Sequence, residues 1–135
     1  MAKKKNKPEK KAQSLPNRLV QGLEEVDVLI EQERWADAQE LLLDLDRRFP
    51  DQPDVLAPLA HVCIEQQKWA DLLYASERLA AHDPNDPDLQ LALAGAYLSS
   101  GFPASALITM RTFLQRWPKH EEAGEAQHMM AELEE

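Results

Sequence analysis

His61 and Cys63 come closest in this chain to a metal-binding or nucleophilic pair. Residues two positions apart on a helix point about 200° away from each other, so these two side chains cannot share a metal ion. The remaining histidines, His82, His120 and His128, have no carboxylate or serine partner at the spacing of a known catalytic motif. We therefore expect Cys63 to be a small core residue and His61 to lie on the surface.

Sequence motifs of enzymes and cofactor sites are missing. The four glycines form no phosphate-binding loop, and neither Cys-x2-Cys nor His-Glu-x2-His occurs. The single cysteine cannot form an internal disulfide, which agrees with a reducing compartment. No stretch approaches the roughly 18 apolar residues of a spanning helix, and the charges after the N-terminus exclude a signal-peptide core. We expect a cytoplasmic, non-enzymatic protein with no cofactor or metal.

A 34-residue repeat organises the chain. "RWADAQELLLDLDRRFPDQPD" at 34–54 is followed at the same interval by "KWADLLYASERLAAHDPNDPD" at 68–88, so Trp35 and Trp69 share one phase. Pro50, Pro84 and Pro118 are spaced by the same interval. A fixed period of this length is the signature of a repeat architecture, in which stacked units supply each other's core.

Each unit is predicted to be two amphipathic helices joined by a tight turn. The first pair begins at Asn17, and its second helix runs from Trp35 to a stop at Pro50. Gly101 suits a left-handed helix end, and Pro103 can start the helix that follows. No sustained two-residue alternation indicates a strand, so the sequence predicts an all-α protein with about six helices before Pro118 and one after it.

The predicted organisation has three parts. Residues 1–16 form a disordered basic tail, because a lysine run with Pro8 and no apolar residue beyond Met1 and Ala2 cannot offset the entropy of ordering. Three helix pairs follow at about 17–52, 53–86 and 87–118. Residues 119–135 form either a capping helix or the first helix of a further repeat in a longer protein.

The repeat resembles the tetratricopeptide family in its period and signature positions. The third unit matches best, with Leu93, Ala94, Tyr97, Ala106, Met110 and Pro118 on those positions in order. The second unit departs from the pattern, with Leu72 in place of the alanine and Ser76 in place of the aromatic residue. The resemblance implies a right-handed solenoid of antiparallel helix pairs. Two rival families fit less well: RNA-binding pentatricopeptide repeats would need a basic stripe that is not visible, and HEAT repeats have a longer period.

The resemblance also implies a partner-binding groove, because the first helix of each unit lines the concave face of such a solenoid. The inward positions would be Leu23, Asp27, Ile30, Ala57, His61, Ile64, Glu65, Leu91, Gly95 and Leu98. This mostly apolar row would hold a peptide or helix of a protein partner, as expected of an adaptor, scaffold or assembly factor.

Recognition of a chaperone tail is disfavoured. The family's chaperone-binding members grip a terminal carboxylate with Lys, Asn and Arg, but the corresponding positions here are Leu23, Asp27, Pro58, Asp88 and Ala92. The string "EEVD" at 24–27 resembles the tail of cytosolic chaperones, yet it is internal and lacks a free carboxylate, so we interpret it as a chance match.

Charge is segregated along the chain. Residues 1–11 carry one glutamate and six lysines, for a net charge of +5, namely Lys3, Lys4, Lys5, Lys7, Lys10 and Lys11. The remaining residues carry 9 basic and 23 acidic side chains, for a net charge of −14. An alternative function is therefore a tether in which the tail binds ribosomal RNA, DNA or an anionic membrane surface. A third reading is a structural segment of a larger protein. The partner and the oligomeric state stay open.

Overall fold

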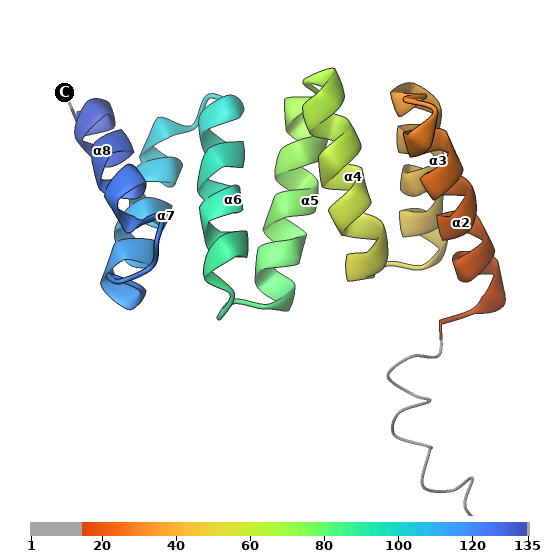
Figure 1. The fold of residues 1–135 in the computed structure, drawn as a ribbon, viewed down its shortest axis with the longest axis horizontal. Helices are drawn as coiled ribbons and strands as arrows, with labels where there is room; N and C mark the ends of the chain where they lie inside the picture. Colours follow the sequence, from red (N-terminus) through yellow and green to blue (C-terminus); the bar gives the residue numbers. More distant parts are fainter. Residues whose placement is uncertain (1–14, 135) are drawn as a thin grey trace, which may run out of the picture.

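The computed structural model of the protein describes residues 15–134, which form seven α-helices and no strand. The helices are α2 (Asn17–Glu31), α3 (Trp35–Arg48), α4 (Pro53–Gln66), α5 (Trp69–His82), α6 (Pro87–Ser99), α7 (Pro103–Arg116) and α8 (Ala123–Glu134). They pack in chain order as one row, with α2, α4 and α8 in front of α3, α5 and α7 in Figure 1. The predicted all-α helical solenoid is confirmed. The predicted disordered tail falls outside the described residues except for its last two, and Leu15 packs against the core.

The helix starts follow from the sequence. Pro53, Pro87 and Pro103 each occupy the first turn of a helix, where the missing backbone N–H has no partner to lose. Asp86 caps α6, and its carboxylate accepts the backbone N–H of Asp88 at 2.9 Å. Proline and capping residues therefore fix where these helices begin.

The turn inside each helix pair contains one residue with a left-handed backbone, and these three residues are spaced by the repeat interval. Glu33 has φ 58°, Gln67 has φ 58° and Gly101 has φ 85°. In each turn the next residue donates its N–H at 2.9 Å to a carbonyl five residues earlier: Arg34 to Leu29, Lys68 to Cys63 and Phe102 to Tyr97. This bond is that of a Schellman helix end. The prediction for Gly101 is confirmed, and the same conformation occurs at two positions without glycine.

Contacts between successive pairs also repeat. The Gln66 side-chain amide donates to the Trp35 carbonyl at 3.5 Å, and the Ser100 hydroxyl donates to the Trp69 carbonyl at 3.2 Å. Both members of the second bond lie 34 residues after those of the first. The Trp35 ring meets the His61 ring edge-on, with their centroids 5.6 Å apart, so this tryptophan packs between the first and second helix pairs.

The core consists of two clusters. The larger joins α2 to α5 and includes Leu19, Leu42, Leu59 and Val62, all fully buried, together with Ala96 of α6. The smaller joins α6, α7 and α8 around Ala94, Ala106 and Met110, with Tyr97, Leu98, Met129, Met130 and Leu133 packed against them. Helix α6 is thus the element at which the two clusters meet.

Candidate functional site

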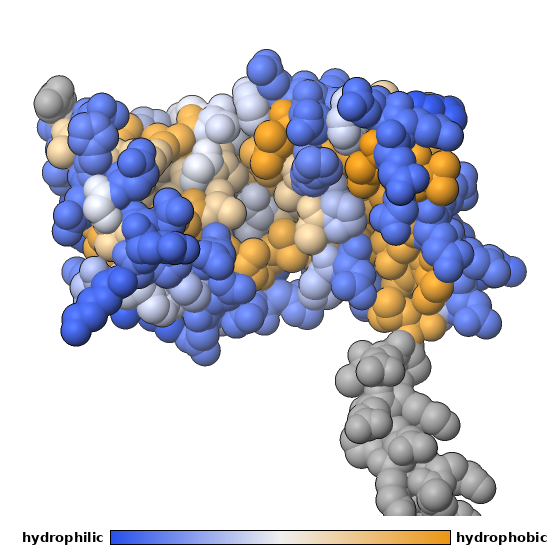
Figure 2. All heavy atoms as spheres, viewed as in Figure 1, coloured by the Kyte–Doolittle hydropathy of each residue, from blue (hydrophilic) through white to orange (hydrophobic). Residues whose placement is uncertain are grey.

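A hollow of about 330 Å³ opens between α4 and α6 over the inner side of α5. This α4–α6 hollow is lined by Ala60, Ile64, Trp69, Leu72, Ser76, Leu79, Leu89, Ala92, Gly95, Ala96 and Ser99. The lining is apolar apart from two serine hydroxyls and the indole N–H. Figure 2 shows the corresponding band of apolar and neutral residues across the middle of the face, between hydrophilic margins.

The hollow lies where the backbones of α4 and α6 stay apart. No Cα atom of α4 lies within 8 Å of a Cα atom of α6, although α2 and α4 do approach that closely. On α6, Ala92, Gly95, Ala96 and Ser99 are spaced by three or four residues and so share one side of the helix. Since all four side chains are small, they leave the space beside α4 unfilled.

The base of the hollow carries a substitution in the repeat pattern. Leu42, Ser76 and Met110 occupy one repeat phase and are all buried, with 0%, 5% and 1% of their surface exposed. Two of these positions hold large apolar side chains, whereas the middle one holds a serine. The departure at Ser76 therefore deepens the hollow at the junction of the second and third units.

A smaller hollow of about 140 Å³ lies on the other side of α6, against α7 and α8. This α8 hollow is lined by Leu91, Ala94, Gly95, Met110, Glu122, Glu125, Ala126 and Met129. Gly95 borders both hollows, and a Cβ atom at Gly95 would have no neighbour within 4 Å. The two hollows thus flank one bare stretch of α6, and carboxylates edge the second.

The predicted groove residues divide among three environments. Ile64, 52% exposed, lines the α4–α6 hollow, Gly95 lines both hollows, and Leu91 lines the α8 hollow. Three others, Leu23, Ile30 and Leu98, are half-buried against the core clusters and so contribute to the core. The remaining four, Asp27, Ala57, His61 and Glu65, are exposed on α2 and α4. The six tail lysines lie outside the described residues.

Several lining residues were not among the predicted set. Leu72, Ser76 and Leu79 come from α5, the second helix of its unit, whereas only first helices were considered. On α6, Leu89, Ala92, Ala96 and Ser99 lie on the side toward α4. The departure at Ser76 was a usable signal, because a small residue in place of a large one at a buried position predicts unfilled space.

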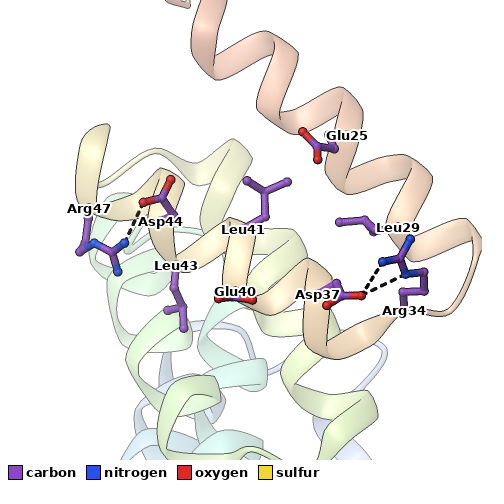
Figure 3. A pocket seen from close by; sticks show the side chains of 9 residues that line it. All are labelled: Glu25, Leu29, Arg34, Asp37, Glu40, Leu41, Leu43, Asp44 and Arg47. Atoms are coloured by element: carbon purple, nitrogen blue, oxygen red, sulfur yellow. Dashed lines mark hydrogen bonds and ion pairs between the residues drawn. The ribbon is translucent and has the colours of Figure 1, made fainter.

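A third recess of about 530 Å³ lies between α2 and α3 and is charged. Figure 3 shows two ion pairs in the recess wall, Arg34 with Asp37 and Arg47 with Asp44. Their N–O distances are 2.8 Å and 2.7 Å. Exposed ion pairs of this kind contribute little to stability, and water readily solvates their charges. We therefore place the candidate site at the α4–α6 hollow, where apolar surface is left uncovered.

Cys63 and His61 lie as predicted. Cys63 is fully buried, and burial raises the pKa of its thiol to about 11, while His61 is exposed. Within residues 15–134, no three His, Cys, Asp or Glu side chains are grouped so as to hold a metal ion. None of the described helices has the length and apolar composition needed to cross a bilayer.

The chain is similar in structure to several solved repeat domains. One is the type III secretion translocator chaperone SycD of Yersinia enterocolitica in complex with a peptide of the translocator YopD, with a TM-score of 0.68, 13% identity and coverage of 89% of this chain and 95% of SycD. Another is the TPR2B domain of yeast Sti1 in complex with pHsp70, with a TM-score of 0.65, 15% identity and coverage of 88% and 98%.

A third similar structure is the first TPR of Spaghetti (RPAP3) bound to the HSP90 peptide SRMEEVD, with a TM-score of 0.65, 13% identity and coverage of 87% and 91%. That peptide ends in the letters found here at 24–27, but in this chain they lie inside α2 and Val26 is 1% exposed. The internal segment is therefore part of a helix and its core contact.

No family model matches the sequence, and no curated protein matches it either. The structural likeness at these identities concerns the fold. Three observations identify that fold. The seven described helices pack in chain order, the sequence repeats every 34 residues, and the three similar structures are repeat domains. The chain has the fold of a tetratricopeptide repeat domain.

Proposed function

We propose that the protein is a non-enzymatic interaction module that binds a peptide or helix of a partner protein in the α4–α6 hollow. The observation that supports this most directly is the hollow itself, where an apolar lining stays exposed between two helices. Burial of such surface by a ligand is favourable by roughly 25 cal/mol per Å². Structurally similar domains in complex with peptides, among them SycD with its YopD peptide, support the same mode of binding.

An adaptor or assembly role follows from peptide binding, because a solenoid presents a preformed surface and needs no cofactor to bind a partner. A cytoplasmic location is part of the proposal and is supported by the free thiol of Cys63.

The test uses peptides selected from a random phage-displayed library against the full chain, with affinities measured by fluorescence polarisation. Ile64→Glu places a charge at the wall of the hollow. It should weaken peptide binding tenfold or more, which corresponds to a loss of at least about 1.4 kcal/mol of binding free energy. The matched control is Ile108→Glu, because Ile108 is 62% exposed on α7 and lines neither hollow. Both variants should keep the melting temperature of the parent.

A second variant fills the site without adding charge. Ser76→Leu places at the base of the hollow the side chain that Leu42 provides one repeat earlier. It should abolish peptide binding while leaving the melting temperature unchanged or higher. Full affinity in both Ile64→Glu and Ser76→Leu would show that the ligand binds elsewhere. Unfolding caused by Ile64→Glu would show that this wall belongs to the core.

The lysine tail supports a second candidate function, because its charge of +5 contrasts with −14 for the rest of the chain. As a tether to RNA or anionic vesicles, it would bind with an affinity that falls steeply with salt and disappears on deletion of residues 1–11. Binding that survives this deletion would exclude the tail.

A further inference from the structure

The acidic side chains are distributed unequally between the two layers of helices. Helices α2, α4, α6 and α8 carry ten carboxylates and a single arginine, Arg18. Helices α3, α5 and α7 carry six carboxylates and five arginines. The layer that contributes both walls of the α4–α6 hollow is therefore strongly negative, and the other layer is close to neutral.

Four carboxylates on or beside the helices of this layer lie next to the two hollows in sequence or in their lining. Glu65 follows Ile64 of the hollow wall and is exposed, and Asp88 precedes Leu89 of the opposite wall. Glu122 and Glu125 line the α8 hollow directly. Neither Glu65 nor Glu125 forms an ion pair with a described residue. A carboxylate oxygen of Asp88 lies 3.2 Å from the Nε2 atom of His120, which can balance its negative charge when the imidazole is protonated.

Cations that could balance these carboxylates are few in this layer. None of the seven described helices contains a lysine, and α4, α6 and α8 contain no arginine. An acidic ligand in the hollow would therefore meet unbalanced negative charge on both sides, and like-charge juxtaposition across an interface is costly. A ligand with positive charges beside its apolar side chains would instead be attracted.

We infer that the ligand of the α4–α6 hollow is a basic amphipathic segment of a partner protein, with apolar side chains for the hollow and lysine or arginine beside Glu65, Glu122 and Glu125. This inference rests on the proposed function and specifies the chemistry of the partner. It separates this groove from one that grips an acidic chain terminus, for which cationic side chains are needed.

The chain's own basic tail fits this site less well than a partner does. Residues 1–11 supply positive charge, but their apolar side chains are limited to Met1, Ala2 and Pro8, too few to fill a hollow of about 330 Å³. A ligand that satisfies only the charge leaves the apolar lining uncovered. The partner segment satisfies both features.

The experiment compares two synthetic amphipathic peptides that share one pattern of leucines and differ in having lysine or glutamate at every polar position. Binding to the full chain is measured by fluorescence polarisation. The lysine peptide should bind at least about tenfold more tightly than the glutamate peptide, and the difference should shrink as salt rises from about 0.05 M to about 0.5 M.

Two charge-reversal variants locate the effect. Glu65→Lys should weaken binding of the lysine peptide several-fold, whereas Glu40→Lys on α3 should not. Glu65 and Glu40 are both exposed helical residues, and their reversal changes the net charge of the protein equally. Ser76→Leu should weaken binding of the lysine peptide as well, because the apolar side chains then lose their place.

Each contrary result has a distinct meaning. Equal affinities for the two peptides, both lost in Ser76→Leu, would overturn the basic preference and leave the proposed groove standing. Binding that responds equally to Glu65→Lys and Glu40→Lys but not to Ser76→Leu would overturn both, because it would be attraction to the whole acidic surface. A more than tenfold rise in affinity on deleting residues 1–11 would identify the tail as the occupant and overturn the partner assignment.

Discussion

Replacing Gln67 by glycine should stabilise the protein. Gln67 has φ 58° and ψ 39°, in the left-handed region, which costs a residue with a Cβ atom about 1–2 kcal/mol. Glycine avoids this cost but adds about 0.4–1 kcal/mol of unfolded-state entropy. The net stabilisation should be about 0.5–1 kcal/mol. The side chain of Gln67 is exposed and makes no hydrogen bond with the described residues, so its removal forfeits no contact.

The equivalent turn of the third unit supplies the opposite change. Gly101 has φ +85°, and a Cβ atom there would have no neighbour within 4 Å. Gly101→Ala should therefore destabilise the protein through the backbone alone, by about the same 0.5–1 kcal/mol. In a domain of this size, each change should shift the melting temperature by about 2–5 °C, upward for Gln67→Gly and downward for Gly101→Ala.

Thermal unfolding followed by circular dichroism at 222 nm, the usual α-helix band, measures both shifts. Gln67→Ala is the matched control: it truncates the side chain but keeps the left-handed cost, so its melting temperature should stay near that of the parent. If Gln67→Gly melts lower than Gln67→Ala, or if Gly101→Ala melts higher than the parent, the assignment of strain to these turns is refuted.

Further predictions concern three groups, the Tyr74 hydroxyl bound to Asp46, the Cys63 thiol and the Phe113 ring. Tyr74→Phe should cost about 1–3 kcal/mol of unfolding free energy, because the Tyr74 hydroxyl donates a hydrogen bond to the carboxylate of Asp46. Asp46 is only 8% exposed, and its second oxygen has no hydrogen-bond partner among the described residues. Urea denaturation measures this loss, and an unchanged midpoint would contradict it. The thiol of Cys63, whose pKa burial raises to about 11, should react slowly with iodoacetamide at neutral pH and rapidly once urea unfolds the chain; equal rates would contradict its burial. Because the unfolded thiol has a pKa of about 8.5, the stability linked to Cys63 is fully present below that pH and is lost as pH rises through about 11, which a series of alkaline melts would detect. Phe113→Ala should cost about 3–5 kcal/mol in the same urea assay, because Phe113 is fully buried, and a loss below 1 kcal/mol would place it outside the core.

The repeat period made most of the fold predictable. Helix starts at proline and tryptophan, the helix end at Gly101 and the burial of Cys63 all follow from local residue preferences and helical spacing. The left-handed conformations at Glu33 and Gln67 were missed because neither side chain signals a positive φ. Only their register with Gly101 does so.

The site was harder to predict because it depends on the distance between elements. A helical wheel places Leu23 and Ile30 on the inner side of α2 much as it places Ile64 on α4. Since α2 approaches α4 while α4 and α6 stay apart, the first two pack against the core and Ile64 borders a hollow. Helix spacing of this kind is set by packing across units, and its sequence signal, a serine at position 76 in register with Leu42 and Met110, shows only when the repeats are compared.

The division of the core has a consequence for how the protein opens. Helices α6 to α8 are held to the rest through Ala96, the contacts of α5 with α6, and side-chain bonds such as that from Tyr97 to Glu77 at 3.0 Å. Backbone amides of α6 to α8 should therefore exchange with solvent deuterium sooner than those of α2 to α5, as a separate cooperative unit. A segment bound between α4 and α6 contacts both units at once. Such a segment would slow deuterium exchange at amides that it does not contact. Binding in the hollow should therefore be detectable at the amides of α7 and α8.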